Sequence, residues 1–306
     1  MIVASIDIGT NTVLLLIAEV NHDKTLSTIL NEYRIPRIGK GLLPGNPIDT
    51  NKIQTLIKVL REYEVLTKKY NCEKVLVTAT NALRISSNGR EITKIIREQF
   101  GWNVNIVSGE EEAYLSYLGA ISDLTNKGKV IVIDIGGGST ELIYGNRNEI
   151  IYKNSFQIGV VSGTGQFLKN DPPTFTQMEN FEKYLENVFK ELGTTKYAPD
   201  VVIALAGTPT TLACMDLNIE EYNEELVEGH NLTFDKIYQI KKHIKKLSSI
   251  EILNSYKSVA KGREDLILAG GIILLKIMEL INLDYIRVST KGIRYGTIIK
   301  EFVLYM

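Results

Sequence analysis

The chain carries the same short pattern of residues twice, and this pattern suits the binding of phosphate. Residues 5–12 read SIDIGTNT, and residues 132–141 read VIDIGGGSTE. In each stretch an apolar strand ends in Asp and a glycine-containing turn follows. Such a turn can direct several backbone N–H groups toward phosphate oxygens, because glycine has no Cβ to block a close approach. The predicted phosphate-binding residues are Gly9, Thr10, Asn11 and Thr12 in the first turn, and Gly136, Gly137, Gly138 and Ser139 in the second.

Asp7 and Asp134 end the strands before these turns. A carboxylate beside a phosphate group needs a cation, because the two negative charges repel each other. Mg²⁺ typically takes one or two carboxylates together with phosphate oxygens and water. We therefore predict that Asp7 and Asp134 bind Mg²⁺ or another divalent cation. A plainer interpretation is that each Asp caps its turn and that both turns are ordinary hairpins.

Other sequence features restrict the kinds of phosphate site and of general base that the chain can have. Neither a P-loop nor a G-x-G-x-x-G sequence that opens a helix after a strand is present. The three histidines, His22, His230 and His243, lie outside the motifs, so a carboxylate is the expected general base. Residues 206–213, AGTPTTLA, suggest a third phosphate-binding loop at Gly207 and Thr208; alternatively, Thr208 caps a helix.

Length and composition describe an ordinary globular chain. Its 306 residues suggest two domains, and the formal net charge of −1 provides no overall field that would attract a nucleic acid. Cys72 and Cys214 are far apart, which favours reduced thiols in a reducing compartment. The N-terminus lacks the features of a signal peptide, and the longest apolar run near it is too short to cross a bilayer. We expect a cytoplasmic protein that binds no membrane, DNA or RNA.

The hydrophobic pattern predicts a similar order of elements in both halves: strand, turn, strand, third strand, then alternating helices and strands. A polar break at residues 123–129 separates the halves. We predict one domain from residues 1–123, joined by the C-terminal segment 297–306, and a second from residues 124–296. Two related α/β domains imply an interdomain cleft, where ligands often bind. The main predicted helices are 89–100, 108–121, 174–192, 236–247 and 262–281.

Six motifs follow one another across nearly the whole chain: DIGTNT, ATNALR, SGEEEA, DIGGGSTEL, AGTPTTLA and GIRYGTI. In this order they resemble the exopolyphosphatase / guanosine pentaphosphate phosphohydrolase family. That family belongs to the superfamily of sugar kinases, heat-shock chaperone ATPases and actin. The resemblance therefore implies a fold of two duplicated ribonuclease-H-like α/β domains.

The resemblance also implies roles for four residues. Glu112, the last Glu of SGEEEA, matches the catalytic base, and Arg84 matches an arginine that contacts the phosphate chain. Asp134 matches a metal ligand, and Glu141 matches an acid that assists the metal or the attacking water. Without the resemblance, Ser108 and Glu111 would be interpreted as a capping box at the start of a helix.

The predicted activity is metal-dependent release of terminal orthophosphate from polyphosphate or from guanosine pentaphosphate (pppGpp), and the sequence does not choose between them. Longer family members carry a further C-terminal helical region, so the chain resembles the short form of the family. This resemblance implies weaker binding of long polyphosphate. It is also compatible with a homodimer. The alternatives are an ATP-dependent kinase of the same superfamily and an actin-like nucleotide-binding scaffold. An ATPase that activates a radical enzyme would need cluster-binding cysteines, which two scattered ones do not supply.

Overall fold

The computed structural model describes residues 1–124, 128–194 and 197–303. The chain forms two compact units: Met1–Ser122 with Lys291–Met306, here called the first unit, and Asp123–Thr290, here called the second unit. The second boundary lies before residue 291 and not at the predicted residue 297, because helix α12 (Ile293–Phe302) is continuous and packs on the first unit. Part of the predicted polar break (125–127) and the end of the predicted C-terminal segment (304–306) lie outside the described residues.

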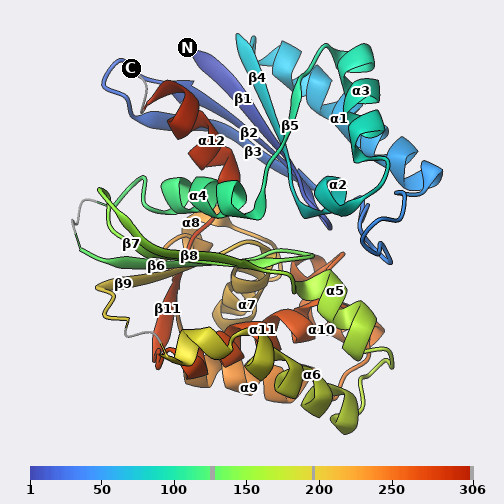
Figure 1. Cartoon of the computed structure of the whole chain (residues 1–306), viewed down its shortest axis with the longest axis vertical. Helices are drawn as coiled ribbons and strands as arrows, with labels where there is room; N and C mark the ends of the chain where they lie inside the picture. The colour runs from blue at the N-terminus through green and yellow to red at the C-terminus, as the bar shows by residue number, and fades with distance from the viewer. Residues whose placement is uncertain (125–127, 195–196, 304–306) are drawn as a thin grey trace. The chain divides into compact units, whose positions relative to one another are not determined.

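The first unit is built on a five-stranded sheet with the order β3-β2-β1-β4-β5 (Figure 1). Its strands are β1 (Ile2–Ile8), β2 (Val13–Val20), β3 (Leu26–Arg34), β4 (Lys74–Ala79) and β5 (Val104–Ile106). The first three strands are antiparallel, whereas β1, β4 and β5 are parallel. Because the carboxyl ends of parallel strands share one edge, residues that follow β1, β4 and β5 are brought together there.

Helices cover both faces of this sheet. They are α1 (Thr50–Lys69), α2 (Asn81–Ile85), α3 (Gly89–Phe100), α4 (Gly109–Ala120) and α12. Side chains alternate along β1, so Ile6 packs into the core under α1 and α3, whereas Val3 packs against α12. Local sequence fixes the helix ends: the Asp49 side chain caps α1, and Gly101 ends α3 with a φ of 72°.

Helices α4 and α12 approach each other unusually closely. A Cβ atom at Gly119 would lie 2.2 Å from the carbonyl oxygen of Gly292, and one at Gly296 would lie 1.8 Å from that of Leu115. Only glycine fits at either position. This contact holds α4 in place, and α4 carries the predicted catalytic base.

The second unit is built on a six-stranded sheet with the order β10-β11-β9-β6-β7-β8. Its strands are β6 (Val130–Ile135), β7 (Thr140–Gly145), β8 (Ile150–Phe156), β9 (Val201–Leu205), β10 (Asn231–Thr233) and β11 (Tyr285–Val288). Strands β6, β7, β8, β9 and β11 have the same neighbours and directions as β1 to β5, and β10 adds an antiparallel edge strand. The repeated topology confirms the predicted duplication of a ribonuclease-H-like α/β domain.

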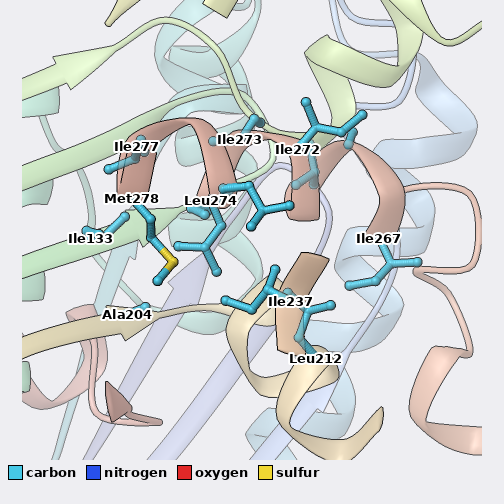
Figure 2. Close-up of a cluster of buried hydrophobic side chains, with 14 of the residues drawn as sticks. Ile133, Ala204, Leu212, Ile237, Ile267, Ile272, Ile273, Leu274, Ile277 and Met278 are labelled. Atoms are coloured by element: carbon cyan, nitrogen blue, oxygen red, sulfur yellow. The ribbon is translucent and has the colours of Figure 1, made fainter. Parts of the chain in front are cut away.

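The helices of the second unit enclose a large apolar core on one face of its sheet. They are α5 (Val160–Phe167), α6 (Phe175–Val188), the 3-10 helix η1 (Lys190–Thr194), α7 (Gly207–Leu217), α8 (Glu224–Val227), α9 (Phe234–Ile244), α10 (Ser249–Ala260) and α11 (Ile267–Leu280). Figure 2 shows Leu274 and Ile277 of α11 among side chains from the sheet, α7 and α9. Helix α11 begins at Ile267 and not at the predicted residue 262, because residues 261–266 form turns.

Two further helix predictions can be compared with the structure. The predicted helix 236–247 corresponds to α9, whose Ile237 and Ile244 are buried. The predicted helix 174–192 corresponds to α6 and η1, but Phe175 is 72% exposed because it lies in the first turn of α6, beyond the edge of the core. Within the described ranges, none of the helices combines the length and apolar character needed to span a membrane.

Candidate functional site

The two glycine turns have the same internal geometry. The N–H of Gly9 donates to the carbonyl oxygen of Thr12 at 3.0 Å, and the N–H of Gly136 donates to that of Ser139 at 3.0 Å. A Cβ atom at Gly9 would lie 2.9 Å from the Thr12 oxygen, and one at Gly136 would lie 3.1 Å from the Ser139 oxygen. An added Cβ atom would therefore crowd the bend at the first glycine of each turn, and more severely at Gly9 than at Gly136.

In the second unit, the start of α5 fixes the direction of the turn's peptide groups. Val160 N–H donates to the Gly136 carbonyl at 3.0 Å, and Val161 N–H donates to the Gly137 carbonyl at 2.7 Å. In a planar trans peptide, the C=O and N–H groups point in opposite directions. The N–H groups of Gly137 and Gly138 therefore point away from α5, as an anion-binding arrangement requires.

The first unit achieves a similar arrangement with a loop in place of a helix. Gly39 N–H donates to the Thr10 carbonyl at 2.8 Å, and Arg37 N–H donates to the Asn11 carbonyl at 3.0 Å. The N–H groups of Asn11 and Thr12 consequently point away from residues 37–39. Each predicted phosphate-binding turn thus presents two consecutive N–H groups on one side.

The acidic residues differ between the two units. Asp134 of β6 lies directly opposite Glu141 of β7, so both carboxylates stand on the same face of the sheet. This face is opposite to the one that carries the apolar core, because the neighbouring Ile133 points into that core. Both acids are buried, and the Ser155 hydroxyl donates to Glu141 Oε1 at 2.7 Å. In the first unit, Asp7 is also buried, but its opposite residue on β2 is Leu14.

The donor set of the second unit fits a hard divalent cation. Two buried carboxylates opposite each other repel, and a cation held by oxygen ligands relieves that repulsion. Among the residues that the structure describes, no group of three or more His, Cys, Asp or Glu side chains could hold a metal ion. Mg²⁺ usually takes only one or two carboxylates and completes its shell with phosphate oxygens and water, so the pair Asp134 and Glu141 is compatible with it. The predicted metal roles of Asp134 and Asp7 stay predictions.

The predicted base and the predicted phosphate-binding arginine form an ion pair in the first unit. Arg84 Nη1 donates to Glu112 Oε2 at 2.7 Å and to the Val107 carbonyl at 2.9 Å, and Nη2 donates to Asn81 Oδ1 at 3.4 Å. The side chain of Glu112 is 7% exposed and that of Arg84 is 19% exposed. The structure thus brings together two residues that lie in separate motifs.

The same sheet edge carries this ion pair and the first turn. Thr80, which follows β4, donates its N–H to the carbonyl of Ile8, the last residue of β1 before Gly9. Val107, which follows β5, donates its N–H to the carbonyl of Ala79. Arg84 and Glu112 therefore lie at the edge where the Gly9 turn is also found, as the parallel strand order requires.

Glu111 of SGEEEA has a structural role. Ser108 caps α4, because its Oγ accepts from the N–H of Glu111 at 3.1 Å. The Glu111 carboxylate accepts a hydrogen bond from Lys300 of α12 at 2.7 Å. Glu112 is the acid of this run that is buried.

The third predicted loop lies at the carboxyl end of β9, next to β6. Its N-cap is Ala206, with a φ of 73°, so Thr208 does not cap the helix but lies within its first turn. A Cβ atom at Gly270 would lie 2.2 Å from Thr208 Oγ1, which places the Thr208 side chain against α11. The Arg263 guanidinium lies against Gly207, where a Cβ atom would be 2.7 Å from Cζ, and Nη1 donates to Thr211 Oγ1 at 3.2 Å.

Two basic residues at these loops were not found by sequence reasoning. Arg263 lies in KGREDL and Arg37 lies in IPRIGK, neither of which forms part of a predicted motif. Neither residue has a sequence signal: Arg37 lies between Pro36 and Ile38, and Arg263 falls inside the predicted helix 262–281. Their positions follow from contacts with distant segments.

The geometry agrees with a known family of enzymes. Residues 16–303 match the family described as the Ppx/GppA phosphatase family. The chain belongs to that family. The match confirms the predicted resemblance, and relatives named for phosphoanhydride hydrolysis confirm the predicted class of enzyme.

Several known proteins are similar in sequence or structure to most of this Ppx/GppA chain. A bifunctional 3-dehydroquinate synthase/phosphatase of Fusobacterium nucleatum is 33% identical over 97% of the chain, which spans 46% of that protein. Exopolyphosphatase 2 of Mycobacterium tuberculosis is 32% identical over 72% of both chains. The crystal structure of the Aquifex aeolicus family member is 35% identical, with a TM-score of 0.83 over 98% of this chain and 97% of its own. This structural match agrees with the predicted fold class.

Proposed function

We propose that this Ppx/GppA chain is a metal-dependent hydrolase that releases terminal orthophosphate from inorganic polyphosphate or from pppGpp. The observation that carries this proposal is the pair of equivalent glycine turns in a chain of a phosphatase family. Each turn has two N–H groups directed away from the segment that bonds its carbonyl groups. The turn of each unit is proposed to bind phosphate oxygens of the substrate.

Backbone donors can bind such a substrate without a basic surface. A hydrogen bond to a charged group contributes about 1.5–3 kcal/mol. The two N–H groups of each turn, those of Asn11 and Thr12 in the first unit and those of Gly137 and Gly138 in the second, can therefore bind phosphate although the chain has a formal net charge of −1.

Arg84 is proposed to bind the reacting phosphate group, and Glu112 is proposed to act as the general base. In the substrate-free protein, the Arg84 guanidinium stabilises the charged Glu112 carboxylate across 2.7 Å. A terminal phosphate group competes for the same guanidinium, because arginine pairs well with phosphate oxygens. When Arg84 turns to phosphate, Glu112 is released to accept a proton from the attacking water.

Asp134 and Glu141 are the residues proposed to hold a divalent cation. When bound, the cation would offset the charge that develops on the phosphate groups. The Ser155 hydroxyl fixes the orientation of Glu141 through its 2.7 Å hydrogen bond, so this carboxylate is positioned before a cation arrives. Asp7 is proposed to assist from the first unit, at the strand end equivalent to Asp134.

Both substrate classes are represented among the relatives. One relative of Pseudoalteromonas translucida is named guanosine-5'-triphosphate,3'-diphosphate pyrophosphatase, and this chain spans 58% of it. The Mycobacterium tuberculosis relative is named an exopolyphosphatase. Both substrates end in the same phosphoanhydride, so we propose both as candidates.

The test is orthophosphate release from short-chain polyphosphate, long-chain polyphosphate and pppGpp, measured side by side with Mg²⁺ and with a chelator. We expect release from at least one substrate and its loss on chelation. If none of the three releases orthophosphate, the proposal fails. An ATP-dependent transfer product would favour the kinase alternative, and nucleotide-dependent polymers would favour the scaffold.

A further inference from the structure

The two units also match where the chain leaves the third strand. Val13 pairs with Arg34 in the first sheet, and Thr140 pairs with Phe156 in the second. Val13 and Thr140 hold the same place in the repeat, since each is the first residue of the second strand. Arg34 and Phe156 are therefore equivalent, and the segments that follow can be compared residue by residue.

The comparison places Arg37 in the position of Gly159. Counting on from Arg34 and Phe156, Arg37 corresponds to Gly159, and Gly39 corresponds to Val161. The hydrogen bonds support this alignment, because the N–H of Gly39 donates to the Thr10 carbonyl and that of Val161 donates to the equivalent Gly137 carbonyl. Both segments thus lie directly beneath a phosphate-binding turn.

At this position the second unit excludes a side chain, whereas the first unit carries a long cationic one. A Cβ atom at Gly159 would lie 2.4 Å from the Gly136 oxygen. Arg37 has a φ of 55°, in the left-handed region that residues with a side chain seldom adopt. Its Nε atom is buried, and its N–H is bonded to the Asn11 carbonyl. A residue with a long charged side chain thus occupies this position, although a glycine would suit its backbone better.

The two units therefore place different positive charges beneath equivalent turns. In the second unit, the N-terminus of α5 points at the turn, and its aligned peptide dipoles act as a partial positive charge. In the first unit, a loop occupies that place, and the helix that follows, α1, begins only at Thr50. The segment in that place carries the cationic side chain of Arg37.

We propose that Arg37 is a phosphate-binding residue of the first unit, which contacts the anion held at the Gly9–Thr12 turn. This inference rests on the proposed function, because it assigns a further contact to the same substrate. The main alternative is a structural ion pair of Arg37 with an acid of the first unit, for example Asp7, which is buried at the end of β1.

The decisive variant is Arg37→Gly, because glycine adopts a φ of 55° without strain while the guanidinium is removed. Lys24→Gly is the matched control. Lys24 has a φ of 66° in the turn between β2 and β3, and its side chain is exposed. Each substitution relieves a left-handed residue, and only the first removes the proposed contact. Thermal melting, KM and kcat with tripolyphosphate are measured for both.

We expect both variants to melt at or above the temperature of the unmodified protein. Arg37→Gly should raise KM about tenfold to a hundredfold, as expected for one lost hydrogen bond to a charged group. KM should change more than kcat, Arg37→Lys should recover part of the loss, and Lys24→Gly should leave KM unchanged.

Two results would overturn the inference: an unchanged KM in Arg37→Gly, or a lower melting temperature with a KM that Arg37→Lys does not recover. The second result would indicate a structural role. If the unmodified protein hydrolyses none of the substrates, the proposed function fails. Calorimetric binding of tripolyphosphate then tests whether Arg37 contacts the anion. Equal binding by the unmodified protein and Arg37→Gly would refute the contact, and at least tenfold weaker binding by the variant would support it.

Discussion

Replacing Glu112 with Gln separates the chemical role of this residue from its structural one. The Gln carbonyl oxygen can still accept from Arg84 Nη1, but the negative charge is lost. Arg84 keeps the Val107 carbonyl and Asn81 Oδ1 as acceptors. Loss of one partner from a buried ion pair costs about 3–5 kcal/mol; because these hydrogen bonds remain, we expect destabilisation of about 1–2 kcal/mol. Loss of a general base should lower kcat by about 10²–10⁴-fold.

The assay is orthophosphate release at saturating substrate, with urea unfolding on the same samples. Glu111→Gln is the matched control, because Glu111 lies one position earlier and pairs with Lys300. We expect the control to retain kcat within about threefold, because Glu111 pairs with Lys300 and has no proposed role in the chemistry. A Glu112→Gln protein that is folded and retains the kcat of the unmodified enzyme would remove Glu112 from the mechanism.

Three further predictions concern the surroundings of the site. Ser155→Ala removes the hydrogen bond to Glu141, so we expect the Mg²⁺ concentration for half-maximal activity to rise about tenfold to a hundredfold; an unchanged metal titration would show that Ser155 does not position this acid. Gly296→Ala would place a Cβ atom 1.8 Å from the Leu115 oxygen, so the free energy of unfolding measured in urea should fall by about 3 kcal/mol or more. The control is Gly165→Ala, whose Cβ atom would meet nothing within 4 Å and which should be neutral or slightly stabilising. Burial raises the pKa of Cys214 to about 11 and also raises that of Cys72, so the native protein should react slowly with iodoacetamide at pH 8 and faster as the pH rises toward 11; rapid labelling at pH 8 would contradict this.

The sequence predicted the repeated part of the fold because its signals are local. An apolar stretch that ends in Asp and is followed by glycine predicts a strand and a tight turn from local residues alone. The same pattern occurs at Gly9 and at Gly136. The equal Gly9–Thr12 and Gly136–Ser139 hydrogen bonds show how faithfully that local pattern is repeated. The burial of Glu112 was not predictable from SGEEEA alone, because three adjacent acids suit any exposed first turn of a helix.

The rest depends on contacts between distant segments. The ion pair of Arg84 with Glu112 forms because β4 and β5 are parallel neighbours, so that residues after each strand meet at one edge. The contact of Arg263 with Gly207 joins segments that no local pattern connects. Helix α2 has only five residues, too few for a hydrophobic period to be recognised.

The central claim is that the glycine turn of each unit takes part in the hydrolysis. Orthophosphate release from tripolyphosphate by Gly9→Ala and by Gly136→Ala tests this claim most directly, with Gly165→Ala as the control. Each turn variant forces a Cβ atom to within 2.9–3.1 Å of a backbone oxygen, whereas the control does not. The account predicts that both turn variants fold and that kcat/KM falls at least tenfold in each. If either one hydrolyses tripolyphosphate as well as the unmodified protein, the claim is contradicted.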